Sequence, residues 1–418
     1  MLVENETKST HKRATSYIAR DTLLDQLRNQ QIPCQEAFDT LFGIQNLLWL
    51  IVALALLRIP VLRLLRGQSP VDLGFLEWSL EGYRGTLIMF VFMMWSCYLF
   101  YLLHWLNAKG VLHVRLADVL FRLMSLLMLI LPFKWISFRG LSPVPSFFLV
   151  LQAHSFFLKS FSFYSVIASA EEDGTAKEEL LNLRNFSYFI LAPTLVYRTK
   201  GYPKSDKIRI GFLLMQILRG LGLLAVIYLI ITEQMLPVFY KAGKLSLLES
   251  IVLLTLPAGS LYLALFFITF EVALNIFAEV TFFADHYFYE DWWNSLSYDE
   301  FSRKWNRPVH EWLAQHVYKR ARIRGFSRMG GIAYTTLFSA IFHEIILAIT
   351  FGKFRLYMTM MMMLQIPLMF GMKLIMRKDS LVRKRIVNTF FWFGMFIGPA
   401  ILITFNVYDW YIQSSGLN

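Results

Sequence analysis

The chain has 418 residues, of which 56% are apolar and only 17% are charged, and its net charge is +12. A soluble domain carries about 25% charged residues, so this composition excludes a string of ordinary soluble domains and favours a protein whose main solvent is lipid. Basic residues of membrane proteins gather in cytosolic loops beside anionic headgroups. No basic stripe lies on a soluble segment, so we expect no nucleic-acid partner.

The sequence contains about nine apolar stretches that approach the length of a membrane-spanning helix, which is about 20 residues. They are residues 41–57, 86–105, 117–135, 144–158, 210–231, 247–270, 332–350, 356–374 and 389–405. The fourth stretch is short, and residues 273–280 extend the sixth. We therefore predict an all-α fold, a polytopic bundle of about nine transmembrane helices over 41–418, preceded by a polar arm over 1–40.

Lysine and arginine are concentrated in the loops that follow the fourth, sixth and eighth stretches, and are sparser after the third, fifth and seventh. Because basic loops stay on the cytosolic side of a membrane, we predict a cytosolic N-terminus and a lumenal C-terminus. The loop after the first stretch does not fit this pattern, because it contains Arg58, Arg63, Arg66 and Arg84.

Residues 285–328 form a segment that is long for a loop between spans, yet it is neither low in complexity nor loosely charged. Its aromatic and imidazole side chains are Trp292, Trp293, Trp305, Trp312, His286, His310 and His316. Rings with polar tips suit a membrane–water boundary. One interpretation is therefore an interfacial helix pair that anchors the bundle, and the other is a segment that carries chemistry.

Residues 288–294 of this segment read FYEDWWN, which fits the signature FYxDWWN, and residues 305–310 read WNRPVH. The pair His343-Glu344 lies inside the seventh apolar stretch, and residues 192–197 read APTLVY. On these motifs the chain resembles the sterol O-acyltransferase and diacylglycerol O-acyltransferase branch of the membrane-bound O-acyltransferases. The resemblance covers residues 186–411 well.

The resemblance implies that residues 41–418 are a catalytic domain that transfers a long-chain acyl group from acyl-CoA to a lipid hydroxyl. It implies catalytic roles for His343, as general base, and for Asn294. It also implies a substrate-binding group made of Phe288, Tyr289, Asp291, Trp292, Trp293, Asn306 and His310. No metal or prosthetic group is implied, because acyl-CoA is a co-substrate. We expect a homo-oligomer, dimeric or tetrameric, in the endoplasmic reticulum membrane.

The chemistry of the side chains agrees with these roles. His343 lies about 17 Å into the seventh stretch at 1.5 Å per residue, and an ionisable residue at that depth is a functional candidate. A neutral imidazole can remove the proton of an alcohol, and the Asn294 amide can donate to a developing oxyanion. The alternative for His343 is a structural histidine that is hydrogen-bonded to a neighbouring helix.

Two carboxylates are interpreted differently. Glu344 follows His343 directly and points about 100° away on the helix, so we expect it to pair with another helix or face a polar cavity. We expect Asp291 to be structural, as a helix cap or as a partner of Arg303 or Lys304.

The remaining candidates carry little support. We expect His286 and His316 to lie on the surface, because no motif includes them. Covalent catalysis is disfavoured, because Cys34 and Cys97 are far from the signature in sequence and no GxSxG elbow is present.

The acceptor is predicted from finer similarities. Residues 283–289, 301–306, 316–318, 354–357 and 364–368 look most like the fungal sterol acyltransferases. We therefore expect esterification of the 3-hydroxyl of a sterol to a storage ester, with diacylglycerol as the alternative acceptor. A non-enzymatic transporter is a remote alternative, which predicts broken helices in corresponding halves, and the sequence contains no repeated halves.

Overall fold

The computed structural model describes residues 42–172, 180–241, 244–376 and 380–408. The predicted arm over 1–40, with Cys34, lies outside the described residues. Within them the regular structure is helical, and the β contact is a single isolated bridge between Lys204 and Phe283. The all-α prediction is therefore confirmed.

The helices fall into consecutive groups along the chain. The first group comprises α3 (Phe42–Leu65), α4 (Leu73–Ser79), α5 (Tyr83–Ala108), α6 (Val114–Arg139), α7 (Pro143–Glu172) and α9 (Leu183–Leu191). The second comprises α10 (Ile210–Leu229), η1 (Ile230–Met235), α11 (Leu236–Phe239), α12 (Leu247–Phe267), η2 (Ile268–Ala273) and α13 (Leu274–Val280). Here η1 and η2 are π-helical turns inside continuous helices.

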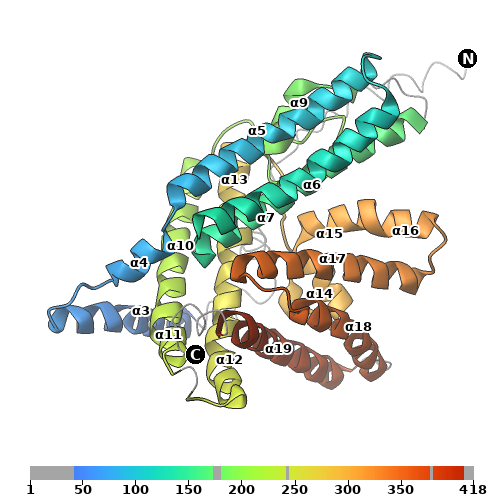
Figure 1. Cartoon of the computed structure of the whole chain (residues 1–418). Helices are drawn as coiled ribbons and strands as arrows, with labels where there is room; N and C mark the ends of the chain where they lie inside the picture. The colour runs from blue at the N-terminus through green and yellow to red at the C-terminus, as the bar shows by residue number, and fades with distance from the viewer. Residues whose placement is uncertain (1–41, 173–179, 242–243, 377–379, 409–418) are drawn as a thin grey trace, which may run out of the picture.

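The third group begins with the loop that carries the FYEDWWN signature. It comprises η3 (Trp292–Asn294), α14 (Tyr298–Trp305), α15 (Arg307–Leu313), η4 (Ala314–Tyr318), α16 (Lys319–Ile323), α17 (Arg328–Phe351), α18 (Tyr357–Ile375), α19 (Leu381–Ile403) and η5 (Thr404–Tyr408). In Figure 1, α5, α6 and α7 lie side by side, α10 and α12 stand across them, and α15 to α19 fill the remaining side.

Seven helical runs in the described residues are long and apolar enough to cross a membrane. They are Leu73–Ala108, Val114–Arg139, Ile210–Phe239, Leu247–Val280, Arg328–Phe351, Tyr357–Ile375 and Leu381–Val407. The first and fourth predicted stretches correspond to α3 and α7, two further helices of 24 and 30 residues. Each predicted stretch thus coincides with a long helix, and residues 273–280 do extend the sixth.

The most enclosed helix is α7, which packs against α5, α6 and α17. Its Lys159 side chain is buried, and the ammonium donates to the backbone carbonyls of Phe189, Ile190 and Ala192 at 2.7 to 2.9 Å. A buried cation is tolerated where such acceptors surround it. Cys97 on α5 is fully buried in the same region, as expected for a packing residue.

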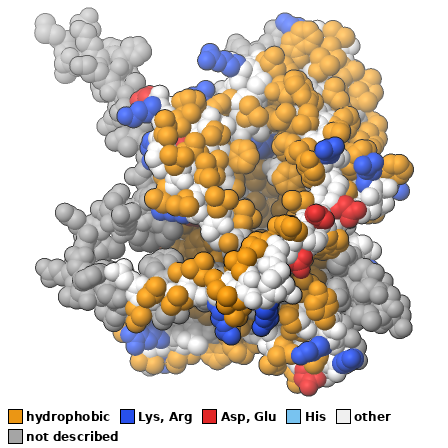
Figure 2. Space-filling model, turned by 90° about the vertical axis from the view of Figure 1, so that its left-hand side faces the viewer, with side chains coloured by type: hydrophobic (Ala, Val, Ile, Leu, Met, Phe, Trp, Pro, Cys, Tyr) orange, Lys and Arg blue, Asp and Glu red, His pale blue; other side chains and the backbone are white. Residues whose placement is uncertain are grey.

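Apolar side chains cover most of the visible face in Figure 2, and lysines and arginines are scattered among and around them. Large apolar residues are also exposed along α5, α6, α10, α12 and α19. A soluble protein rarely exposes apolar surface on this scale, so the outer faces of these helices are suited to contact lipid.

Candidate active site

The signature loop is held by an aromatic cluster. Trp292 is almost fully buried, with its ring centroid 5.1 Å from Phe266, 4.8 Å from Trp305 and 5.6 Å from Trp392. These partners belong to α12, α14 and α19, so one tryptophan joins three elements that are distant in sequence. From α19, the Asn388 amide also donates to one backbone carbonyl of η3 at 2.8 Å and to that of Ser295, just after η3, at 3.2 Å.

Asp291 has the structural partner expected from the sequence. Its carboxylate lies 2.9 Å from the ammonium of Lys304, which also contacts Glu300 at 2.7 Å. Burial opposes the charged form of Lys304, but the two carboxylates outweigh burial and raise its pKa. Asn294 donates to the other Asp291 oxygen at 3.3 Å. Asp291 thus fixes the signature to α14 through Lys304.

The residues predicted to bind substrate differ in exposure. Phe288, Tyr289 and Trp292 are buried, Trp293 is partly buried, and Asn294 is exposed. The motif therefore contributes an inner set of packing side chains and an outer set that remains accessible at the η3 turn.

The next two motif residues are the N-cap of α15 and a residue of that helix. Asn306 caps this helix, because its side-chain oxygen accepts from the Val309 amide at 3.2 Å. His310 lies one turn further on and is partly buried. Burial first, and then the nearby charges of Arg303 and Arg307, lower the pKa of His310. It is therefore a neutral imidazole near neutral pH.

His343 has a defined tautomer. Its Nδ1 lies 2.8 Å from the carbonyl oxygen of Ser339, one turn earlier on α17. Because a carbonyl only accepts, the neutral ring carries its proton on Nδ1 and its lone pair on Nε2. The ring lies deep among protein atoms, yet its side chain is exposed, and in the described part of the chain no hydrogen bond engages Nε2.

The helix that faces His343 carries a second imidazole. His154 on α7 packs edge-on against Phe342 at 5.3 Å and lies close enough to His343 for the two rings to interact electrostatically. Its Nδ1 bonds the Val150 carbonyl at 2.7 Å. The two histidines therefore share one tautomer and one region between α7 and α17.

In the described part of the chain, no hydrogen bond, ion pair or ring contact joins Asn294 to His343. The signature contacts α12, α14 and α19, whereas His343 lies on α17 opposite α7. The structure thus gives these two side chains separate supports.

Glu344 pairs with another helix, as expected. Its buried carboxylate accepts from the backbone amides of Arg355 at 3.3 Å, Leu356 at 2.7 Å and Thr359 at 3.0 Å. These amides lie just before α18 and in its first turn, so the carboxylate caps the start of α18 from α17. Leu356 has a left-handed backbone with φ of 62°, a conformation that costs energy outside glycine.

The expectation that His286 and His316 lie on the surface was wrong, because both are buried. His286 donates from Nδ1 to the Asn275 amide oxygen at 2.8 Å. His316 lies 2.9 Å from the Ser162 hydroxyl, and burial, followed by the charge of Arg320, lowers its pKa to about 4. Both histidines are buried by contacts with residues far away in the sequence, which a local motif does not indicate.

A hollow of about 290 Å³ lies between α7, the α15–α16 region and α17. Basic and aromatic side chains share its lining, which comprises Phe157, Phe161, Trp312, His316, Val317, Arg320, Ala321, Arg324, Tyr334 and Phe338. Phe338 stacks on Phe342 with ring centroids 4.7 Å apart. Phe342 directly precedes His343, so a single aromatic contact connects the lining of this hollow to the residue next to His343.

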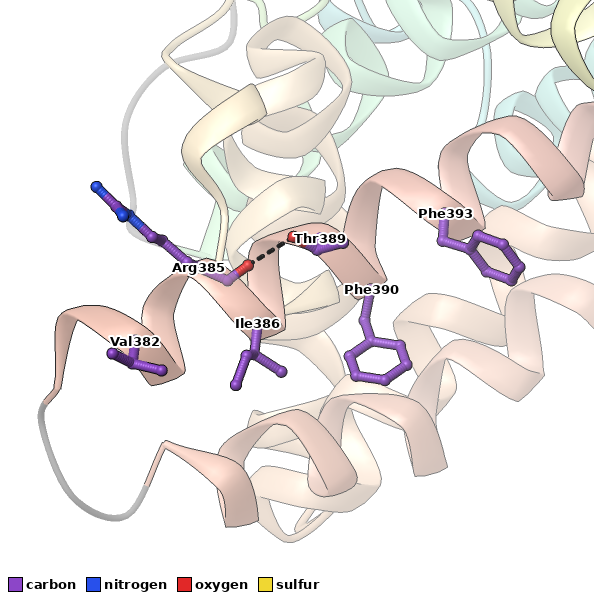
Figure 3. Close-up of a pocket in the computed structure, with 6 residues that line it drawn as sticks. All are labelled: Val382, Arg385, Ile386, Thr389, Phe390 and Phe393. Carbon is purple, nitrogen blue, oxygen red and sulfur yellow. Dashed lines mark hydrogen bonds between the residues drawn. The ribbon is translucent and has the colours of Figure 1, made fainter.

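A second hollow, of about 490 Å³, is an open groove along α19 alone. Figure 3 shows Ile386 and Phe390 projecting to one side of the helix, whereas Arg385 points away from them. The opposite face, with Val387 and Phe391, is buried. The groove therefore lies on the outer face of α19 and is distinct from the face that contacts the signature.

Among residues 42–172, 180–241, 244–376 and 380–408, no group of three or more His, Cys, Asp or Glu side chains could hold a metal ion.

The fold and these side chains define a polytopic helical membrane protein with an imidazole deep in one helix and an aromatic signature loop. The profile of the membrane-bound O-acyltransferase family matches residues 85–407, and the chain belongs to this family.

Several curated proteins are similar to the chain. It is 36% identical over 230 residues to diacylglycerol O-acyltransferase 1 of Dictyostelium discoideum, which covers 53% of this chain and 36% of that protein. It is 34% identical over 266 residues to probable sterol O-acyltransferase 1 of Schizosaccharomyces pombe, covering 60% and 48%. For sterol O-acyltransferase 1 of Mus musculus the identity is 30% over 284 residues, covering 65% and 52%. The match thus spans about half the length of these relatives, or less.

Proposed function

We propose that the chain transfers a long-chain acyl group from acyl-CoA to the hydroxyl of a lipid acceptor, with His343 as general base. The observation that carries the proposal is the free Nε2 of an imidazole deep in α17, held in one tautomer by the Ser339 carbonyl. Relatives named as sterol and diacylglycerol O-acyltransferases support the same reaction class.

The proposed reaction is a direct attack. Nε2 of His343 removes the proton of the acceptor hydroxyl while its oxygen bonds the thioester carbonyl carbon. The carbon–sulfur bond then breaks, and the CoA thiolate takes the proton back from the imidazolium, so the products are an ester and CoA thiol. We assign to the exposed Asn294 amide the donation of a hydrogen bond to the developing oxyanion. Neither a metal nor a prosthetic group takes part in this scheme.

We assign the CoA portion to the hollow between α7 and α17. Arg320 and Arg324 line it together with aromatic rings, and guanidinium groups suit phosphate oxygens while rings suit an adenine. His310 on α15 belongs to the same cytosolic mouth in this proposal. The apolar acyl chain and acceptor approach between helices from the lipid.

A sterol is the first candidate acceptor, because several segments around the signature resemble the fungal sterol enzymes. Diacylglycerol is the second candidate, and the 36% identity to a diacylglycerol O-acyltransferase favours it. Identities this close do not separate the two acceptors. We also propose a homo-oligomer in the endoplasmic reticulum membrane, with the N-terminus cytosolic and the C-terminus lumenal.

The test supplies labelled oleoyl-CoA to the purified full chain with either a sterol or diacylglycerol. The labelled product identifies the acceptor, and absence of both esters contradicts the proposal. His343→Ala should remain folded but lose about 100- to 10,000-fold in ester formation, the contribution of a general base. His113→Ala is the matched control, because this exposed histidine only caps α6. Full activity of His343→Ala would refute the assigned base.

A further inference from the structure

Three buried polar side chains form a stripe along the span Leu247–Val280. Glu271, Asn275 and Glu279 follow one another at intervals of four residues and are 3%, 0% and 2% exposed. Residues four apart lie on one face of a helix, so this polar stripe is a single feature. Carboxylates at membrane depth are costly unless paired, and are functional candidates by default.

At one end of the polar stripe, Glu271 ties the signature to α10. One carboxylate oxygen accepts from the Tyr289 hydroxyl at 2.8 Å, and the other contacts the guanidinium of Arg219 at 3.3 Å. Arg219 lies about 14 Å along α10 from its first residue, at 1.5 Å per residue. Tyr289 belongs to the FYEDWWN motif, so its hydroxyl reaches an ion pair well inside the apolar span of α10.

At the other end, Glu279 and Asn275 hold the residues just before the motif. Glu279 pairs with Arg209 at 3.0 Å, and Arg209 in turn lies 3.3 Å from Nε2 of His286. Nδ1 of His286 donates to Asn275 at 2.8 Å. Since Arg209 can only donate, Nε2 of His286 is the acceptor in this contact.

The π-helical turn η2 (Ile268–Ala273) contains Glu271, and its backbone is held in place by Asn275. A π turn leaves backbone carbonyls without their ordinary α-helical partners. The Asn275 amide donates to two of them, those of Phe270 at 3.1 Å and Glu271 at 2.9 Å. The backbone that carries Glu271 is therefore fixed independently of the loop that it contacts.

We propose that Glu271 is a positioning residue that orients the signature loop, up to Asn294, through its hydrogen bond with Tyr289. This inference rests on the proposed acyl-transfer function. Burial of Phe288 and Trp292 holds the loop in the bundle, but the hydrophobic effect is non-directional. The hydrogen bond to a fixed carboxylate sets the depth and rotation of the motif. Asp291 and Asn388 fix the end of the motif locally, and the Tyr289 contact adds the depth at which Asn294 is presented.

The test compares Tyr289→Phe and Glu271→Gln in the full chain. Phenylalanine keeps the ring against Phe266, whose centroid is 5.1 Å away, and removes only the hydroxyl. A misplacement of about 1 Å costs on the order of 100-fold in turnover. We expect a fall of that size in kcat, with the KM for acyl-CoA within about twofold, because a transition-state contact is lost rather than uniform binding. The double variant should be no worse than Glu271→Gln alone.

Glu233→Gln is the matched control. Glu233 also lies on a π turn, η1, and also pairs with an arginine, Arg63 at 3.5 Å, but the ion pair is remote from the signature. Its kcat should stay at the wild-type value. A wild-type kcat in Tyr289→Phe would overturn the proposal. So would the same rise in KM and the same fall in kcat in Tyr289→Phe, Glu271→Gln and Glu233→Gln alike.

A second measurement does not require activity. Hydrogen exchange of the Glu290 and Trp292 amides, which are bonded to backbone carbonyls, should be faster in Tyr289→Phe and Glu271→Gln than in wild type and Glu233→Gln. Unchanged exchange refutes the positioning role even if no acceptor is ever esterified. If the two variants exchange faster than wild type but the wild-type chain esterifies neither acceptor, the positioning role stands and only the proposed function is refuted.

Discussion

Replacing Glu344 with alanine should destabilise the junction between α17 and α18. The carboxylate accepts three backbone amides of the α18 start, and the two shorter bonds, from Leu356 and Thr359, are 2.7 and 3.0 Å long. A buried donor left without a partner costs about 1–3 kcal/mol. The two shorter bonds together therefore predict a loss of about 2–6 kcal/mol. Relaxation of the strained φ of Leu356 would offset part of this loss, because the carboxylate also holds that conformation.

The assay is the thermal unfolding of the purified full chain in one detergent, with Glu344→Ala, Glu344→Gln and wild type side by side. Glutamine keeps one acceptor oxygen and should fall between the other two. Glu249→Ala is the control, since Glu249 caps the start of α12 at an exposed position. If Glu344→Ala melts at the wild-type temperature, the carboxylate does not support α18 and this reasoning fails.

Three further outcomes follow from buried groups. Lys159→Met should cost at least about 3 kcal/mol, because three carbonyls lose their donor, and a lower melting temperature would show it. Gly259→Ala should cost about 1–3 kcal/mol, because the new Cβ would overlap the Phe396 ring, whereas Gly371→Ala meets open space; equal melting temperatures would contradict this. Burial and then a neighbouring arginine lower the pKa of His316 from 6.5 to about 4, so on acidification the unfolded chain binds the proton first. Stability should be full above pH 6.5 and fall toward pH 4, and His316→Gln should flatten that dependence in melting curves.

The helices were predictable because lipid demands continuous apolar length, and each predicted stretch coincides with a long helix. The errors have physical reasons. The fourth stretch was predicted to end at residue 158, but α7 continues to Glu172. The side chains just beyond residue 158 are polar because they face protein: Lys159 bonds the end of α9, and Ser162 bonds His316. Hydropathy does not distinguish a polar residue that faces another helix from one that faces water.

The candidate site was predictable where a compact motif carried it, and less so where tertiary partners define it. The pairing of Asp291 with Lys304 and the separate role of Glu344 followed from local spacing. The burial of His286 did not, because its partners lie on two other helices. The four-residue spacing of Glu271, Asn275 and Glu279 inside an apolar stretch was a signal in the sequence that could have indicated a buried polar face.

The π turn at Ile268–Ala273 sets where the span Leu247–Val280 can lose a residue without turning its polar face. A π turn holds one residue more than an α turn, so a deletion inside it would leave an ordinary α turn and keep Asn275 and Glu279 on the face toward His286 and Arg209. Deleting a residue from the regular helix after it, such as Leu274, would instead rotate the remaining residues by about 100°. The span would be long enough for the bilayer in both cases, so topology mapping would score the two deletions alike, although only the second removes the anchor of the loop beyond.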